Sequence, residues 1–143
     1  MLSEVGKRCE AVEEFYEFML AYAAQGLRTD EGSKSGAQVR EFLQRAAESL
    51  TGLTEVCAKA VREEGLEPAD KYAAFLAVLD RDSRDSLAAI ELVLAQPAIS
   101  SQLIDNLNAS IHLRALLTDL FLLDEILKKH VNPAEQVATN KGD

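Results

Sequence analysis

Long stretches of this chain repeat apolar residues at alternating steps of three and four, and only three prolines occur in its 143 residues. Steps of three and four bring side chains to one side of an α-helix, because the helix has 3.6 residues per turn. The first stretch shows this spacing at Leu2, Val5, Cys9, Val12, Tyr16, Met19 and Ala23. Such a regular helical spacing predicts an all-α fold.

Four helices are predicted, separated by short segments that contain glycine, serine or proline. We expect them over residues 3–25, 37–64, 69–96 and 99–129. Their similar lengths and short connections predict one domain over residues 1–130, an antiparallel four-helix bundle with up-down-up-down topology. Residues 131–143 are expected to form a polar, frayed C-terminal tail.

The third predicted helix has an unusual middle, the segment DRDSRDS, which lies between two apolar patches. A continuous helix would place Ser83 on the buried side of the bundle. A kink or break between Asp80 and Ser86 is the alternative. The sequence leaves both possibilities open.

The fourth predicted helix carries more apolar residues than a bundle helix needs, since about a third of its surface is enough. Leu117, Phe121, Leu122 and Ile126 form the surplus. These side chains either fill a broad core or make a second apolar face that is buried against another subunit or a partner helix. We prefer the second interpretation, and therefore expect a homodimer or a complex with another protein.

The formal net charge is −9, with 24 acidic and 15 basic residues. A surface of this sign repels phosphates and anionic lipid headgroups, so neither nucleic acid nor a membrane surface is expected as a partner. The longest apolar-rich stretch, residues 113–127, is too short and too charged to span a bilayer. The N-terminus lacks the basic and apolar regions of a secretory signal, so we expect a cytoplasmic protein.

Two cysteines and two histidines are few ligands for a metal. Cys9 and Cys57 are both expected at inward positions about one helical turn apart. At these positions, two reduced thiols in the core are a simpler interpretation than a disulfide or a redox pair. Neither His112 nor His130 follows a glutamate by three residues, as diiron carboxylate bundles require. We expect no cofactor and no metal.

His112 lies in the segment ASIHLRALLTD, residues 109–119. Part of this segment resembles the histidine box of sensor histidine kinases, in which a helical histidine accepts a phosphoryl group. Aligned without gaps, Ile111 takes the position of that histidine. A phosphoryl acceptor needs an imidazole that faces solvent. We interpret His112 as a partly buried structural histidine, and keep a histidine phosphotransfer or signalling module that uses His112 as the alternative.

The first predicted helix contains the run Glu13-Glu14-Phe15-Tyr16-Glu17, which resembles the EExxE pattern of MazG-like all-α nucleotide pyrophosphohydrolases. In that family an ExxD pair on the facing helix completes a magnesium site. The second predicted helix has no such pair. We interpret the glutamates as a solvated helix face, and keep a metal-dependent pyrophosphohydrolase as a second alternative.

The sequence contains no set of catalytic side chains at a recognisable spacing. The leading hypothesis is therefore a non-enzymatic helical-bundle protein that acts through protein–protein association. The exposure of two residues, Leu122 and His112, separates this hypothesis from the phosphotransfer alternative.

Overall fold

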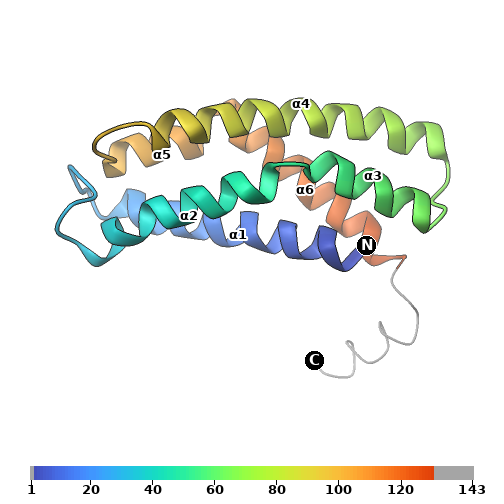
Figure 1. Ribbon diagram of the computed structural model, residues 1–143, viewed down its shortest axis with the longest axis horizontal. Helices are drawn as coiled ribbons and strands as arrows, with labels where there is room; N and C mark the ends of the chain where they lie inside the picture. Colours follow the sequence, from blue (N-terminus) through green and yellow to red (C-terminus); the bar gives the residue numbers. More distant parts are fainter. Residues whose placement is uncertain (1, 131–143) are drawn as a thin grey trace, which may run out of the picture.

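The computed structural model describes residues 2–130, and within this range all regular secondary structure is α-helical. Six helices follow one another: α1 (Leu2–Ala24), α2 (Lys34–Leu50), α3 (Leu53–Glu63), α4 (Ala69–Leu94), α5 (Ser101–Ala109) and α6 (Ile111–Lys128) (Figure 1). The predicted all-α class is confirmed, whereas the predicted number of four helices is not. The tail expected at residues 131–143 lies outside the described residues.

The two additional helix boundaries come from interruptions of the backbone. The second predicted helix is interrupted at Thr51 and Gly52, where Gly52 has a φ of 73°. Glycine adopts this left-handed conformation without a steric penalty. The fourth predicted helix is interrupted at Ser110, whose extended backbone ends α5 and begins α6. The Ser110 hydroxyl accepts a hydrogen bond from the backbone N–H of Leu113, as N-cap residues do.

α4 runs without interruption from Ala69 to Leu94, through the whole DRDSRDS segment. The kink or break considered between Asp80 and Ser86 does not occur. Ser83 is buried, with 4% of its surface exposed, as the continuous alternative requires. Ser86 is buried as well, so two serines occupy core-facing positions that apolar residues usually fill.

α1 and α4 are the two longest helices, and each of them packs against α2, α3, α5 and α6. In Figure 1, α4 runs along the top of the molecule and α1 along the bottom. α2 and α3 follow one another along the length of the molecule, and so do α5 and α6 (Figure 1). Each interrupted pair therefore covers the length that α1 or α4 covers as one helix.

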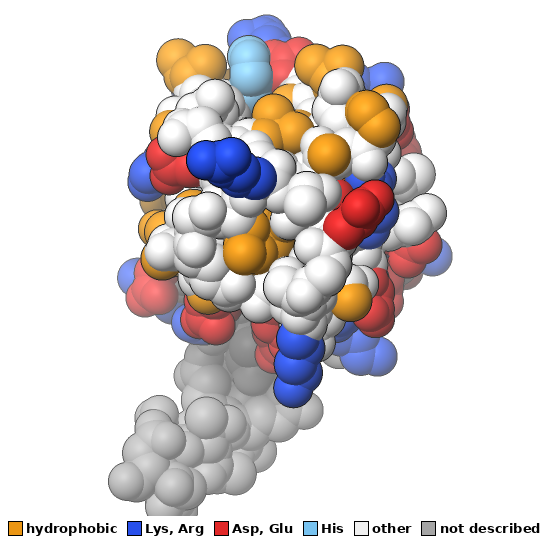
Figure 2. All heavy atoms as spheres, turned by 90° about the vertical axis from the view of Figure 1, so that its left-hand side faces the viewer, with side chains coloured by type: hydrophobic (Ala, Val, Ile, Leu, Met, Phe, Trp, Pro, Cys, Tyr) orange, Lys and Arg blue, Asp and Glu red, His pale blue; other side chains and the backbone are white. Residues whose placement is uncertain are grey.

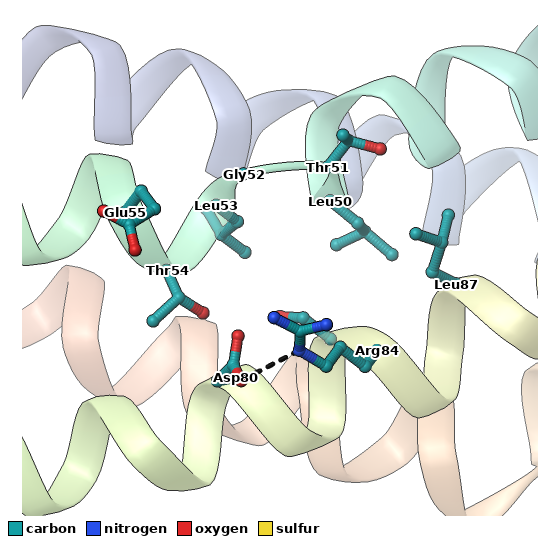
Figure 3. A pocket seen from close by; sticks show the side chains of 10 residues that line it. Leu50, Thr51, Gly52, Leu53, Thr54, Glu55, Asp80, Arg84 and Leu87 are labelled. Atoms are coloured by element: carbon teal, nitrogen blue, oxygen red, sulfur yellow. Dashed lines mark hydrogen bonds and ion pairs between the residues drawn. The ribbon is translucent and has the colours of Figure 1, made fainter.

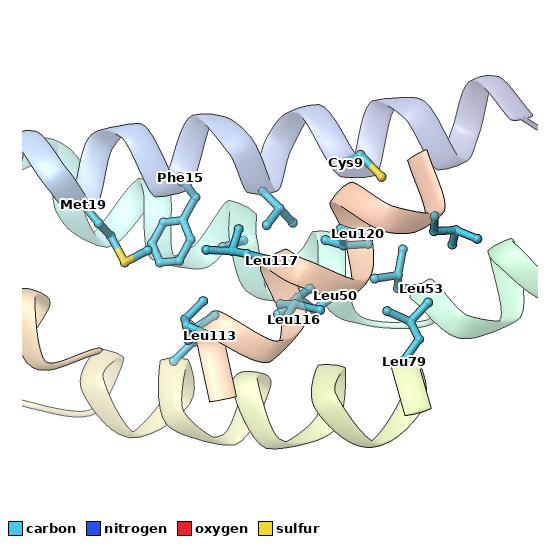
Figure 4. Packing of buried hydrophobic residues seen from close by; sticks show 14 of the residues in the cluster. Cys9, Phe15, Met19, Leu50, Leu53, Leu79, Leu113, Leu116, Leu117 and Leu120 are labelled. Carbon is cyan, nitrogen blue, oxygen red and sulfur yellow. The ribbon is translucent and has the colours of Figure 1, made fainter. Parts of the chain in front are cut away.

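A single cluster of buried apolar side chains fills the space between the helices. Figure 4 shows Leu113, Leu116 and Leu120 of α6 in this cluster, together with Met19 of α1 and Leu79 of α4. Burial of a side chain of this size contributes about 1.5–3 kcal/mol to folding. The repeated leucines of α6 thus belong largely to the core.

The loop between α1 and α2 is tied to the loop between α4 and α5. Asp30 accepts hydrogen bonds from the backbone N–H of Ile99 at 2.8 Å and from Arg40 Nε at 2.9 Å. The Ile99 N–H and the Arg40 guanidinium hold the pKa of Asp30 below its ordinary value. Arg40 also donates to the carbonyl oxygens of Leu94 and Gln96, where the end of α4 leaves carbonyl groups without a partner in the helix.

Candidate functional site

An open apolar groove lies between the first half of α4 and the second half of α6. Its volume is about 210 Å³, and it is lined by Lys71, Tyr72, Phe75, Leu122, Leu123 and Ile126. Tyr72, Phe75 and Ile126 are half-buried, whereas 51% of Leu122 is exposed. Apolar side chains outside the core come together here and form a small apolar surface that a partner could contact.

The structure divides the four residues predicted as a partner surface. Leu122 and Ile126 line the groove, and Phe121 is 47% exposed. Leu117 is not part of this surface, because only 5% of it is exposed and it lies among the core side chains in Figure 4. Residues three apart share one side of a helix, so Leu117 faces the core together with Leu120.

The α4 wall of the groove was not identified from the sequence. Tyr72 and Phe75 are three residues apart on α4, and both pack against the core while also lining the groove. The sequence feature that could have identified this wall is the apolar patch at the start of the third predicted helix. Only Leu76 and Leu79 of that patch are buried. Half of that patch was therefore available for a surface.

His112 is exposed, in the first turn of α6. The interpretation as a partly buried structural histidine is therefore wrong. The physical reason is the interruption at Ser110, since α6 starts there and its first two side chains face outward. Ile111, which precedes His112, is 75% exposed.

Of the glutamates in the Glu13–Glu17 run of α1, Glu13 is half-buried and the other two face solvent. Glu14 and Glu17 are exposed, and Glu14 forms an ion pair of 3.4 Å with Arg45 of α2. Within residues 2–130, no three side chains of His, Cys, Asp or Glu are grouped so as to hold a metal ion. The pyrophosphohydrolase alternative thus gains no ligand set from the described part of the chain.

Cys9 of α1 and Cys57 of α3 are free and buried, so the predicted inward positions are confirmed. Burial raises the pKa of Cys9 to about 12 and that of Cys57 to about 11. The thiolate loses its hydration in the core, which favours the neutral thiol. A neutral thiol is a poor nucleophile.

A buried carboxyl group on α6 was not identified from the sequence. Asp119 is 7% exposed and interacts with Asp82 of α4. Burial, together with the hydrogen bond and the charge of Asp82, raises the pKa of Asp119 to about 7. The sequence does contain an indication of this buried carboxyl group, because Asp119 interrupts a run of leucines.

The end of the molecule that carries the α1–α2 and α4–α5 loops is drawn in Figure 2. Acidic and basic side chains lie around its edge and also on the face itself, and apolar side chains form separate small groups between them. In the part of the chain that the structure describes, no helix is both long and apolar enough to cross a membrane. Comparison of the chain with protein-family models, curated proteins and solved structures gives no match.

Proposed function

We propose that this protein is a non-enzymatic helical protein that acts through protein–protein association, and that its partner is a second copy of the same chain. The observation that carries the proposal is the apolar groove between α4 and α6, with Leu122 half exposed at its edge. Covering apolar surface is favourable by about 25 cal/mol per Å². A partner that covers the groove therefore gains stability.

The shape of the groove supports a second copy as the occupant. A two-fold homodimer needs a surface that fits itself, with a projection and a hollow close together. Phe121 and Leu122 are exposed on α6, and Tyr72 and Phe75 line the groove next to them. In a two-fold contact, the α6 side chains of each copy would enter the groove of the other.

The charges beside the groove also support a second copy. Lys71 lines the α4 side with 79% of its side chain exposed. Glu125 is exposed on α6, one residue before Ile126. Crossing α4 of one copy over α6 of the other would bring these unlike charges together. This pairing would offset part of the repulsion between two chains of net charge −9.

We further propose that the six helices form an antiparallel up-down-up-down bundle of four rods, in which a rod is either one long helix or two consecutive helices. α2 with α3 is one rod and α5 with α6 is another. Two residues separate the first pair and one residue separates the second. Supporting this view, α1 and α4 each pack against both interrupted rods. Helices in such a bundle bury one side, which leaves the outer sides of α4 and α6 to a partner.

We propose the cytoplasm as the compartment. Free Cys9 and Cys57 favour a reducing environment, in which thiols persist. The excess of acidic residues disfavours nucleic acid and anionic membrane surfaces as partners. Among these macromolecular partners, a protein is the one that the net charge does not disfavour.

Sedimentation velocity over a wide concentration range tests the homodimer. The wild-type protein is expected to shift from the mass of a monomer towards that of a dimer. Leu122→Gln keeps the net charge and should weaken association by about tenfold or more, because a buried leucine contributes about 1.5–3 kcal/mol. Leu92→Gln is the matched control, because Leu92 is 66% exposed on α4 and does not line the groove.

Two outcomes would contradict the proposal. A wild-type protein that stays monomeric at the highest concentration removes the homodimer. Equal weakening by Leu122→Gln and Leu92→Gln removes the groove as the interface. Association with a different protein, seen without any dimer, would keep the groove but change its occupant.

A second candidate function, histidine phosphotransfer, is favoured by one observation, the exposure of His112. A partner or a small phosphodonor could reach its imidazole. Incubation with acetyl phosphate should then produce an acid-labile, alkali-stable phosphoryl group. His112→Gln should abolish this label, whereas His130→Gln, at the other exposed histidine, should retain it. A wild-type protein that acquires no such label excludes this candidate.

A further inference from the structure

A cavity of about 210 Å³ lies at the interruption between α2 and α3, opposite the middle of α4 (Figure 3). One wall is formed by residues 50–55, and the other wall by Asp80, Ser83, Arg84 and Leu87 of α4. The cavity is separate from the α4–α6 groove, with which it shares no lining residue. Three polar side chains of the DRDSRDS segment, those of Asp80, Ser83 and Arg84, line this cavity.

α3 begins at this cavity without a side-chain cap. Its N-cap is Gly52, which has no side chain to accept a hydrogen bond. The first N–H groups of a helix have no partner inside the helix, and they favour a negative charge. In α3 these groups belong to Leu53, Thr54 and Glu55, all of which line the cavity.

Two hydroxyl groups of the cavity lining have no hydrogen-bond partner among the described residues. They are Ser83 Oγ and Thr54 Oγ1, both shielded from solvent. The unpartnered hydroxyl of Ser83 is the stronger indication of a ligand, because only 4% of this residue is exposed. A buried hydroxyl without a partner costs about 1–3 kcal/mol. A cavity with two such groups is therefore suited to a molecule that bonds to both.

Arg84 brings a positive charge to the same cavity. Its Nε donates to Asp80 Oδ2 at 2.9 Å, and Figure 3 shows the guanidinium beside the Asp80 carboxylate, with the α2–α3 wall opposite both groups. The remaining N–H groups of a guanidinium match two oxygens of a phosphate or a carboxylate. Glu55, the other carboxylate of the lining, points away from the centre of the cavity in Figure 3.

We propose that this cavity binds a phosphate-sized oxyanion. The N–H groups at the start of α3, the hydroxyls of Thr54 and Ser83, and the guanidinium of Arg84 donate hydrogen bonds to its oxygens. The volume is below the roughly 300–1,000 Å³ of pockets for drug-sized ligands, so the ligand is a small ion or one group of a larger molecule. The site is independent of the association proposed above.

Thermal unfolding in inorganic phosphate tests the site, with sodium chloride at the same ionic strength as the reference. The wild-type melting temperature should rise with phosphate concentration, since a ligand that binds only the folded state stabilises it. Parallel titrations with sulfate and acetate distinguish a tetrahedral oxyanion from a carboxylate. The backbone amide signals of Leu53, Thr54 and Glu55 should shift in nuclear magnetic resonance spectra during the same titration.

Ser83→Ala and Arg84→Gln should each abolish the rise in melting temperature. Ser83→Ala replaces an unpartnered hydroxyl, so without phosphate it should be at least as stable as the wild type. Arg81→Gln is the matched control, because Arg81 is exposed on α4 and does not line the cavity. It should retain the rise.

Either of two results would overturn the proposal. One is a melting temperature that responds to none of the three oxyanions. The other is a response that Ser83→Ala leaves unchanged, because binding would then occur elsewhere. Ser83→Ala decides the matter even if Arg84→Gln fails to fold.

Discussion

The hydroxyl of Ser86 on α4 donates a hydrogen bond of 2.9 Å to the backbone carbonyl oxygen of His112 on α6. Ser86 is completely buried, whereas its acceptor belongs to the exposed His112, so the bond is partly buried. A typical intramolecular hydrogen bond contributes about 0.5–1.5 kcal/mol to stability. Ser83 and Ser86, three residues apart, therefore differ in role: Ser83 lines a cavity, and Ser86 links two helices.

Ser86→Ala should lower the free energy of unfolding by about 1 kcal/mol, because the bond to α6 is lost. Urea denaturation measures this change. Ser49→Ala is the control, since the Ser49 hydroxyl is exposed and bonds only within its own helix. It should change the free energy of unfolding by less than about 0.5 kcal/mol. Equal stability of the two variants would show that the α4–α6 bond contributes nothing.

Gly36→Ala should destabilise the protein, although alanine is the better helix former. A Cβ at Gly36 would overlap the backbone of Asp30, a residue whose carboxylate is held by the N–H of Ile99 and by Arg40. Overpacking of this kind costs about 1–3 kcal/mol. Gly6→Ala in α1 meets nothing within 4 Å and should stabilise by up to about 1 kcal/mol. Two variants that change stability in the same direction would contradict this view of the loop.

Asp119→Asn should stabilise the protein more at pH 8 than at pH 5. Burial and Asp82 raise the pKa of Asp119 from 3.8 to about 7 in the folded protein. The folded state therefore holds the proton more tightly, and the stability that this proton contributes is lost as the pH rises through about 7. Asparagine stays neutral and avoids this loss.

Urea unfolding of wild type and Asp119→Asn at both pH values measures the effect. Asp105→Asn, at an exposed position on α5, is the control and should give no comparable gain at pH 8. A difference between Asp119→Asn and wild type that is the same at both pH values would show that Asp119 is not protonated in the core.

Cys9 and Cys57 should resist alkylation by iodoacetamide at pH 8 in the native protein. Both thiols are buried, and burial raises their pKa values to about 12 and about 11, so little thiolate forms. The same protein unfolded in urea should react at both sites, as mass spectrometry would record. A cysteine that reacts equally fast in the native and unfolded protein would have to lie at the surface.

The bounds were predicted well for the two helices that the structure leaves longest, α1 and α4, although the sequence left the continuity of the latter open. The first helix was expected over residues 3–25 and is found at Leu2–Ala24, and the third was expected over residues 69–96 and is found at Ala69–Leu94. The interruptions at Gly52 and Ser110 could not be predicted. A glycine inside a helix costs only about 1 kcal/mol, so packing with other helices decides whether the helix continues.

Only some residues of the candidate groove could be named from the sequence. The surplus of apolar residues on the fourth predicted helix named Leu122 and Ile126, which line the groove, and Phe121, which is exposed, while their role as a partner surface stays a prediction. Leu117 was misplaced, because composition shows that a surplus exists and only the direction of each side chain shows which residues form it. The exposure of His112 depended on the unpredicted interruption at Ser110.

The order of apolar and polar residues by itself determined an all-α chain with inward-facing cysteines. Helical spacing is a local property, so it is visible in the sequence without any knowledge of the fold. Only the tertiary structure decided where two rods are interrupted, that Ser83 and Asp119 are buried, and that Tyr72 and Phe75 meet α6. These features arise between residues distant in the chain. Their energies depend on what packs against each side chain rather than on its neighbours in sequence.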